Sequence, residues 1–289
     1  MTPRVDVAFL THAELGEGPV WDPRHNELLW VDCTRGQVHR FDPVTGHDVA
    51  ISIGVHVGAV AWRRAGDYVV AADSGFMTVD DAGAVTVIAD AVPERCGAVM
   101  NDGACDISGR FWAGTTSPDR EPTAGLYRLD GDHTVTRVVS GVRLSNGIGW
   151  SPDSRLMYYV DSRTQGLDVF EFDVDDGAVR NRRRLVDIDA NVGIPDGLAI
   201  DVEGCVWLAL WGPGLVRRYT PRGDLDREVS VPTSHTTSCG FGGPALDVLY
   251  ITSARFGLSE QQRQLQRHAG SVFAVVPGVH GLPSYGYAE

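Results

Sequence analysis

The sequence contains no lysine, because all 25 of its basic residues are arginine. Schiff-base catalysis, the phosphate-binding P-loop and the nucleotide site of protein kinases each need a lysine at a fixed place. These kinds of chemistry are therefore excluded, although a coding bias toward arginine is enough to explain the composition itself.

Cysteine is also scarce, with five residues at Cys33, Cys96, Cys105, Cys205 and Cys239. No two of them have C-x-x-C spacing and their number is odd, which excludes a zinc framework and a disulfide scaffold. The start of the chain lacks the basic and apolar regions of a signal peptide, and no apolar stretch reaches 18 residues. We therefore expect a cytoplasmic protein whose thiols are small buried side chains.

Positive charge is in deficit, since 38 acidic residues outweigh the 25 basic ones and give a formal net charge of −13. This balance argues against binding to nucleic acid or to an anionic membrane surface. Hydrophobic residues make up 43% of the 289 residues, which excludes disorder as the main state. No linker or shift in composition is present, so we expect one domain over 1–289.

An internal repeat is the main signal in the sequence. Short apolar runs that follow a turn recur every 40 to 48 residues, a spacing typical of β-propeller blades. The six runs are ELLWVD (27–32), DYVVAA (67–72), RFWAGT (110–115), RLMYYVD (155–161), CVWLAL (205–210) and VLYITS (248–253).

The surroundings of each run are also repeated. A turn rich in Gly, Pro, Asp and Ser precedes each run, and a second segment with period-2 alternation follows it. The pattern predicts an all-β chain, a six-bladed β-propeller of four-stranded blades with a central channel. Only the segment 258–267 could form a helical turn, and we expect it to be a surface loop.

Polar residues occupy one equivalent position at the start of four of the six predicted innermost strands. They are Glu17 in EGPVWD, Asn101 in NDGACD, Asn146 in NGIGWS and Asp196 in DGLAID. Radial repetition should bring these four side chains together at one mouth of the channel. Two carboxylates there would repel one another unless a cation lay between them, and all-oxygen ligands select a hard cation such as Ca²⁺ or Mg²⁺.

Simpler interpretations exist for these residues. An Asn or Asp followed by Gly often only begins a turn, but polar residues at four equivalent places of the repeat favour a shared site. His56 lies two residues before the second inner position and could reach the channel, although a structural or rim role is the expectation for it and for His235. The sixth unit is less regular, and we place Cys239 at its inner position as a small wall residue.

The motifs LGEGPVWD (15–22), MNDGACDISGRFWAGT (100–115), LSNGIGWSPD (144–153) and PDGLAID (195–201) resemble, in order, those of one family. This is the family of gluconolactonase, regucalcin (senescence marker protein) and luciferin-regenerating enzyme. The resemblance covers nearly the whole chain. It implies a six-bladed propeller with one divalent cation in the channel, and hydrolysis of sugar lactones as the commonest activity.

The resemblance also implies roles for individual residues. The family's metal ligands fall on Glu17, Asn146 and Asp196, while Asn101 falls at the edge between substrate and metal and Asp102 supports it. Sugar-lactone members commonly carry an arginine two residues before the Asn of N-D-G, where this chain has Val99. An acidic substrate contact often follows the A-G-T strand, and Asp119 stands in that region.

The function predicted from these observations is metal-dependent hydrolysis of a lactone. The cation, with Ca²⁺ as first choice and Zn²⁺, Mn²⁺ or Mg²⁺ open, would polarise the carbonyl group while water attacks, with Asp196 as the candidate general base. Since Val99 cannot hydrogen-bond a polyol, a less hydroxylated lactone is also open. The alternatives are another ester or phosphotriester hydrolase on the same site and a non-catalytic Ca²⁺-binding propeller. The sequence does not predict the oligomeric state.

Overall fold

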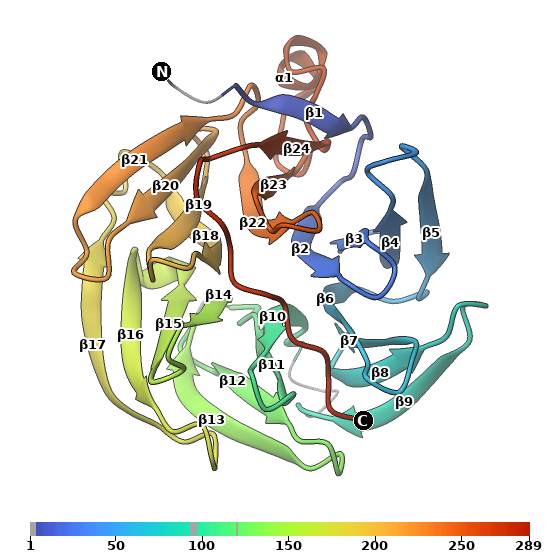
Figure 1. Cartoon of the computed structure of the whole chain (residues 1–289), viewed down its shortest axis with the longest axis vertical. Helices are drawn as coiled ribbons and strands as arrows, with labels where there is room; N and C mark the ends of the chain where they lie inside the picture. The colour runs from blue at the N-terminus through green and yellow to red at the C-terminus, as the bar shows by residue number, and fades with distance from the viewer. Residues whose placement is uncertain (1–3, 93–96, 120) are drawn as a thin grey trace.

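The computed structural model describes residues 4–92, 97–119 and 121–289. Six four-stranded antiparallel sheets are arranged radially around a central axis, with the first strand of each unit innermost (Figure 1). This arrangement confirms the predicted six-bladed propeller. The predicted runs at 27–32 and 248–253 coincide with strands, and the other four differ from strands by one residue at one or both ends.

The first three blades use consecutive strands, from the channel outward. They are β2 (Gly16–Asp22), β3 (Glu27–Asp32), β4 (Gln37–Phe41) and β5 (Asp48–Ser52); β6 (Val57–Trp62), β7 (Tyr68–Ala72), β8 (Gly75–Val79) and β9 (Val85–Asp90); and β10 (Met100–Cys105), β11 (Phe111–Thr115), β12 (Ala124–Leu129) and β13 (Val135–Val142).

The fourth and fifth blades follow the same order. They are β14 (Ser145–Trp150), β15 (Leu156–Asp161), β16 (Gly166–Phe172) and β17 (Val179–Asp187); and β18 (Ile194–Ile200), β19 (Val206–Trp211), β20 (Leu215–Tyr219) and β21 (Leu225–Ser230). A short 3₁₀ helix, η2 (Ser162–Thr164), follows β15.

The sixth blade is completed by the start of the chain. Its inner strands are β22 (Thr236–Gly242), β23 (Val248–Ser253) and β24 (Val272–Val275), and its outer strand is β1 (Asp6–Phe9), which pairs antiparallel with β24. The two ends of the chain therefore close the ring. Periodicity alone does not reveal this pairing, because it joins segments that are distant in the sequence.

The register of β22 corrects the expected position of Cys239. Thr236 pairs with Ser253 as Ser145 pairs with Asp161 in blade four, which makes Thr237 the equivalent of Asn146. Cys239 lies two residues further along the strand. Its thiol is buried and free, like those of Cys33, Cys105 and Cys205, whereas Cys96 lies outside the described residues.

The Asp102-Gly103, Asn146-Gly147 and Asp196-Gly197 pairs lie within inner strands and do not begin turns. A Cβ atom added to Gly147 would lie 2.7 Å from the carbonyl oxygen of Asp196, and one added to Gly58 would lie 2.4 Å from that of Asn101. Real Cβ contacts are longer than this, so glycine lets neighbouring inner strands approach closely around the axis.

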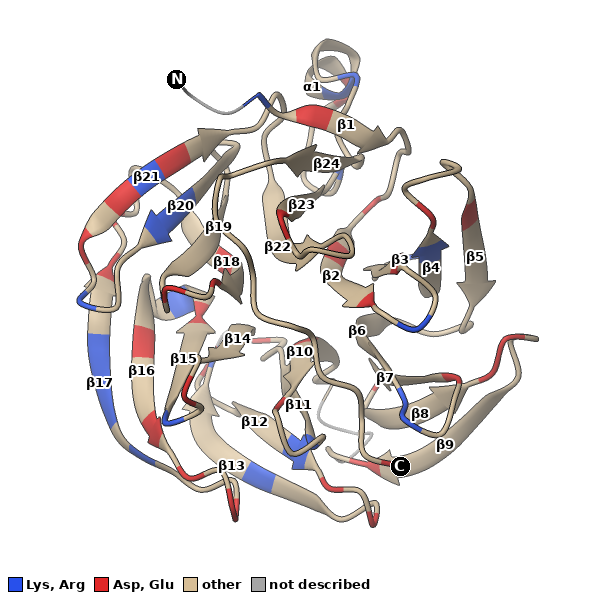
Figure 2. Ribbon diagram, in the orientation of Figure 1, with Lys and Arg blue, Asp and Glu red and all other residues tan. Residues whose placement is uncertain are grey.

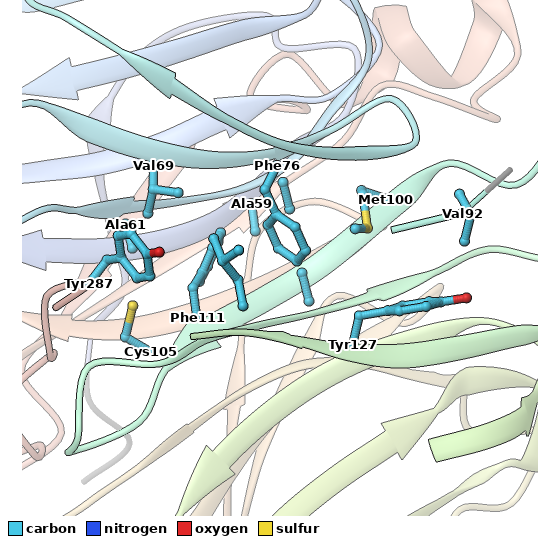
Figure 3. Close-up of a cluster of buried hydrophobic side chains, with 13 residues drawn as sticks. Ala59, Ala61, Val69, Phe76, Val92, Met100, Cys105, Phe111, Tyr127 and Tyr287 are labelled. Atoms are coloured by element: carbon cyan, nitrogen blue, oxygen red, sulfur yellow. The ribbon is translucent and has the colours of Figure 1, made fainter. Parts of the chain in front are cut away.

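The core consists of apolar layers between neighbouring blades. Figure 3 shows one layer, in which Phe76 of blade two packs edge-on against Phe111 of blade three at a ring separation of 5.7 Å. Tyr287, from the end of the chain, is buried in the same layer.

The segment after β24 crosses one end of the channel (Figure 1). Backbone hydrogen bonds fix it to three inner strands or their turns: Leu282 N donates to Ile200 O, Tyr287 N to Trp62 O and Ala288 N to Gly109 O. Between this segment and the inner strands lies an apolar cavity of about 150 Å³ whose lining includes Leu282 to Tyr285. This end of the channel is covered, so the opposite end is the one that can admit a ligand.

Segment 258–267 contains a helix and not the expected loop. The helix α1 (Glu260–Leu265) begins with a capping box, in which Ser259 Oγ accepts from Gln262 N and the Gln262 side chain accepts from Ser259 N. The helices in the described part of the chain lack the length and apolar character needed to cross a membrane.

Charged residues gather on the outer strands and loops (Figure 2). On β17, Arg182 and Arg184 both form ion pairs with the buried Asp168 of the neighbouring strand β16, at 2.6 and 2.8 Å. These pairs join two outer strands and are remote from the channel mouth.

Candidate metal centre and pocket

The four inner polar residues lie together as the repeat predicts. Glu17 on β2, Asn101 on β10, Asn146 on β14 and Asp196 on β18 all line one cavity of about 520 Å³ at the uncovered end of the channel. The side chains come from four blades, so no local segment could have assembled them.

Three of these residues are withdrawn from water. Glu17, Asn146 and Asp196 are 9%, 4% and 6% exposed. Asn146 Nδ2 donates to Ser162 Oγ at 3.0 Å, while Asn146 Oδ1 and Glu17 Oε2 have no hydrogen-bond partner among the described residues. Buried polar atoms are normally satisfied, so unpartnered acceptor oxygens at one cavity fit a site for a cation.

The electrostatics of the site support the same interpretation. Burial, followed by the negative charges of Asp196 and Asp102, raises the pKa of Glu17 well above its ordinary value. Burial and the charge of Asp102 likewise raise the pKa of Asp196, which a hydrogen bond from Asn146 partly offsets. Burial raises the pKa of Asp102 to about 6. A divalent cation between these three carboxyl groups would offset their mutual repulsion and favour their ionised forms.

Asn101 and Asp102 lie at the edge of this centre. Asn101 Nδ2 donates to the carbonyl oxygen of Ser145 at 2.7 Å, which joins blades three and four beside Asn146. Asp102 Oδ1 accepts from Gly103 N at 2.8 Å, and Asp102 does not line the cavity itself. Its influence on Glu17 and Asp196 is electrostatic.

Two other predicted substrate residues do not line the cavity. Val99 is partly buried, and its carbonyl oxygen accepts from Thr116 N at 2.9 Å. Asp119 is exposed, and its Oδ1 accepts from Ser117 Oγ at 2.6 Å and from Glu121 N at 3.1 Å. The carboxylate of Asp119 is therefore used in a local turn.

The cavity wall repeats a second position that the sequence reasoning largely missed. It lies two residues before each inner position and is occupied by Leu15, His56, Leu144 and Ile194 in four blades. His56 is thus part of the wall, as its place two residues before the inner position allowed, and its Nε2 has no hydrogen-bond partner in the described part of the chain. Counting back from the inner positions would have revealed this ring.

The loops that connect the second and third strands complete the mouth of the cavity. They contribute Thr34, Ser162, Arg163 and Phe256, and Trp211 at the end of β19 lies next to them. Trp211 stacks on His235, with ring centres 4.1 Å apart and an angle of 10° between the ring planes. His235 therefore packs behind Trp211 and helps to hold it in the cavity wall. These loops have no common sequence pattern and could not be assigned in advance.

A separate group of possible ligand atoms lies on Asp201, Glu203 and Cys205. Asp201 Oδ2 already accepts from Trp207 Nε1 at 2.9 Å and from Arg218 Nε at 2.8 Å, and Arg218 also pairs with Glu203. Arginine neutralises this group, so we do not assign it a cation.

Fold and site together define a six-bladed propeller with an oxygen-lined, acidic pocket at its one open mouth. Residues 15–255 match the family described as the SMP-30/Gluconolactonase/LRE-like region. The chain belongs to this family, as the sequence motifs indicated.

Relatives and solved structures agree with this assignment. The chain is 39% identical to regucalcin of Danio rerio over 98% of each protein, and 33% identical to regucalcin of Homo sapiens over 99% of this chain and 98% of the human one. A structure described as a calcium-binding protein, regucalcin from Agrobacterium tumefaciens, superposes with a TM-score of 0.95 at 27% identity, covering 99% of this chain and 98% of that one.

Proposed function

We propose that this chain is a divalent-cation-dependent lactonase whose site is the open mouth of the propeller. The observation that carries the proposal is the buried set of Glu17, Asn146 and Asp196, with two unpartnered acceptor oxygens at one cavity. Family membership supports it, because the family description includes gluconolactonases. The whole chain, 1–289, is proposed to act as one domain, since β1 completes the sixth blade.

Glu17, Asn146 and Asp196 would hold the cation through oxygen atoms, for which Ca²⁺ is the first choice and Mg²⁺, Mn²⁺ and Zn²⁺ are alternatives. When bound, such a cation supplies Lewis-acid polarisation of a carbonyl oxygen. Asn101 lines the same cavity and can donate to or accept from substrate oxygens, and Asp102 adds negative charge next to it.

Asp196 is the proposed general base. Water attacks the lactone carbonyl carbon, a carboxylate oxygen of Asp196 accepts its proton, and the ring C–O bond breaks as the ring oxygen gains a proton. The product is the open-chain hydroxy acid. Burial raises the pKa of Asp196, which makes the carboxylate a better proton acceptor than an exposed aspartate.

The test is hydrolysis of sugar, aliphatic and aromatic lactones, followed by acid release. Wild type is assayed with Ca²⁺, Mn²⁺, Zn²⁺ or EDTA beside Glu17→Gln and Asp196→Asn, with the exposed Asp90→Asn on β9 as the matched control. We expect Asp196→Asn to lose about 10²-fold or more of kcat, since a positioned general base contributes that much, and Glu17→Gln to lose activity because it removes a ligand of the cation.

Calorimetric titration with each cation separates the other candidate functions. Tight binding without turnover of any lactone would refute the lactonase proposal. Turnover of a phosphotriester would then favour a different hydrolase, and its absence would favour a non-catalytic cation-binding propeller. A cytoplasmic location is also proposed, from the four buried free thiols, and fractionation of cells tests it.

A further inference from the structure

The wall of the open cavity is more apolar than a site for a polyol requires. Its apolar members come from the start of three inner strands or the residue just before it, from the end of β19 and from one loop, and they are Leu15, Leu144, Ile194, Trp211 and Phe256. Apolar side chains offer no hydrogen bonds to sugar hydroxyls, whereas they stabilise a bound hydrocarbon or aromatic group by excluding water.

One arginine interrupts this apolar wall. Arg163 lines the cavity from η2, and its side chain is exposed at the mouth. No hydrogen bond or ion pair of its guanidinium group is found within the described residues, although most arginines of this acidic protein are paired. Apart from His56, it is the one basic side chain that the described part of the chain places in the cavity.

The backbone that carries Arg163 is firmly held. The buried carboxylate of Asp161 accepts from Arg163 N at 3.3 Å and from Leu144 N at 3.1 Å, so one side chain fixes both the arginine and part of the apolar wall. The residue before Arg163 is Ser162, whose Oγ accepts from Asn146 Nδ2. The backbone that carries the free guanidinium group is thus held next to Asn146, a proposed cation ligand.

We propose that the pocket binds lactones that carry an apolar ring or chain together with a carboxylate, and that Arg163 binds this carboxylate. The inference rests on the proposed lactonase function and names its substrate class. A guanidinium group binds carboxylates through two parallel hydrogen bonds, which fixes the orientation of the ligand as well as its charge.

The charges of the site explain why such a residue is needed. The chain has a net charge of −13, and Glu17 and Asp196 face the same cavity, so an anionic substrate would be repelled without a fixed positive charge at the mouth. A divalent cation would offset the two carboxylates, and Arg163 would then decide which part of the substrate lies outermost.

The experiment compares matched charged and neutral compounds. The substrates are 5-oxo-2-phenyltetrahydrofuran-3-carboxylate and the corresponding carboxamide, and the unreactive probes are 4-phenylbutyrate and 4-phenylbutyramide, titrated calorimetrically. The variants are Arg163→Gln and Arg163→Lys. Arg143→Gln is the matched control, because Arg143 is an exposed arginine on the adjacent loop that does not line the cavity.

We expect wild type to favour the carboxylate in both assays. Arg163→Gln should weaken 4-phenylbutyrate binding and lower the ratio of kcat/KM for carboxylate over carboxamide, each by about tenfold, the smaller end of what a charge-assisted hydrogen bond contributes. Arg163→Lys should retain part of the preference, since it keeps the charge but loses the planar pair of donors.

Failure of this inference can be told apart from failure of the lactonase proposal. Equal binding of the charged and neutral probes, or equal effects of Arg163→Gln and Arg143→Gln, would overturn the role of Arg163 even if lactones are hydrolysed. Arg163-dependent binding of 4-phenylbutyrate without hydrolysis of these two lactones or of any sugar, aliphatic or aromatic lactone would support the anion site and refute the lactonase.

Discussion

Replacing Asp102 with asparagine should stabilise the protein when no cation is bound. Burial raises the pKa of Asp102 from an ordinary 3.8 to about 6, and Asp102 in turn raises the pKa of both Glu17 and Asp196. One pKa unit corresponds to about 1.4 kcal/mol, so the ionised Asp102 costs the folded state up to about 3 kcal/mol at high pH. Asparagine has nearly the same shape and removes this charge.

The sign of the pH dependence follows from the raised pKa. The folded state holds the proton of Asp102 more tightly than the unfolded chain does. The free energy of unfolding therefore falls as pH rises from about 3.8 to about 6 and the folded protein must lose that proton. Asp102→Asn should therefore raise the free energy of unfolding by about 1–3 kcal/mol at pH 8 in EDTA, which is about 2–5 °C in Tm for a chain of this length. The gain should shrink as pH falls toward 4.

The assay is thermal unfolding of wild type and Asp102→Asn at several pH values, with EDTA and with Ca²⁺. In Ca²⁺ the gain should be smaller, because a bound cation offsets the same charge. The exposed Asp90→Asn should stay within about 0.5 kcal/mol of wild type. A lower or unchanged Tm for Asp102→Asn at pH 8 in EDTA would refute the reasoning that three mutually repelling carboxyl groups form the site.

Three further predictions concern the cation, the pocket wall and the covered end of the channel. Addition of Ca²⁺ should stabilise wild type by about 2.7 kcal/mol at 100 times the dissociation constant, and Glu17→Gln should abolish most of this rise in Tm; an equal rise in the variant would exclude Glu17 as a ligand. Burial lowers the pKa of His56 in the folded protein, so the protein loses stability as pH falls below the pKa that this histidine has in the unfolded chain. His56→Leu should therefore lose less Tm between pH 7 and pH 5 than wild type does. An identical loss in the variant would argue against a buried neutral imidazole. Tyr287→Ala should lower the free energy of unfolding by about 3–5 kcal/mol in urea titrations, because it empties a fully buried aromatic position between blades two and three, and a loss below about 1 kcal/mol would show that the terminal segment is not part of the core.

The sequence predicted the strands well where turns and apolar runs recur together. The run 27–32 is β3 in full, since a short run with an apolar centre between two turns has little alternative in an all-β chain. The segment 258–267 was less well predicted, because its capping box at Ser259 and Gln262 was outweighed by its polar composition. The shift from Cys239 to Thr237 in blade six reflects a register that only strand pairing sets.

The cation ligands and the substrate pocket differ in how far the sequence revealed them. Glu17, Asn146 and Asp196 were predictable because each occupies the same place in a repeat, and radial symmetry turns an equal place in the repeat into nearness in space. Arg163 and Trp211 were not, because Arg163 lies on a loop and Trp211 ends β19 next to one, and the lengths and sequences of these loops differ from blade to blade.

The sequence by itself determined the number of blades, the inner strand of most blades and the polar ring around the axis, since these follow from local turn residues, alternation and a repeated spacing. Only the tertiary structure decided the closure of the ring by β1, the covering of one mouth by the terminal segment and the chemistry of the wall at the other. These features depend on contacts between residues far apart in the chain, which hydrogen bonding and close packing select and which no local pattern records.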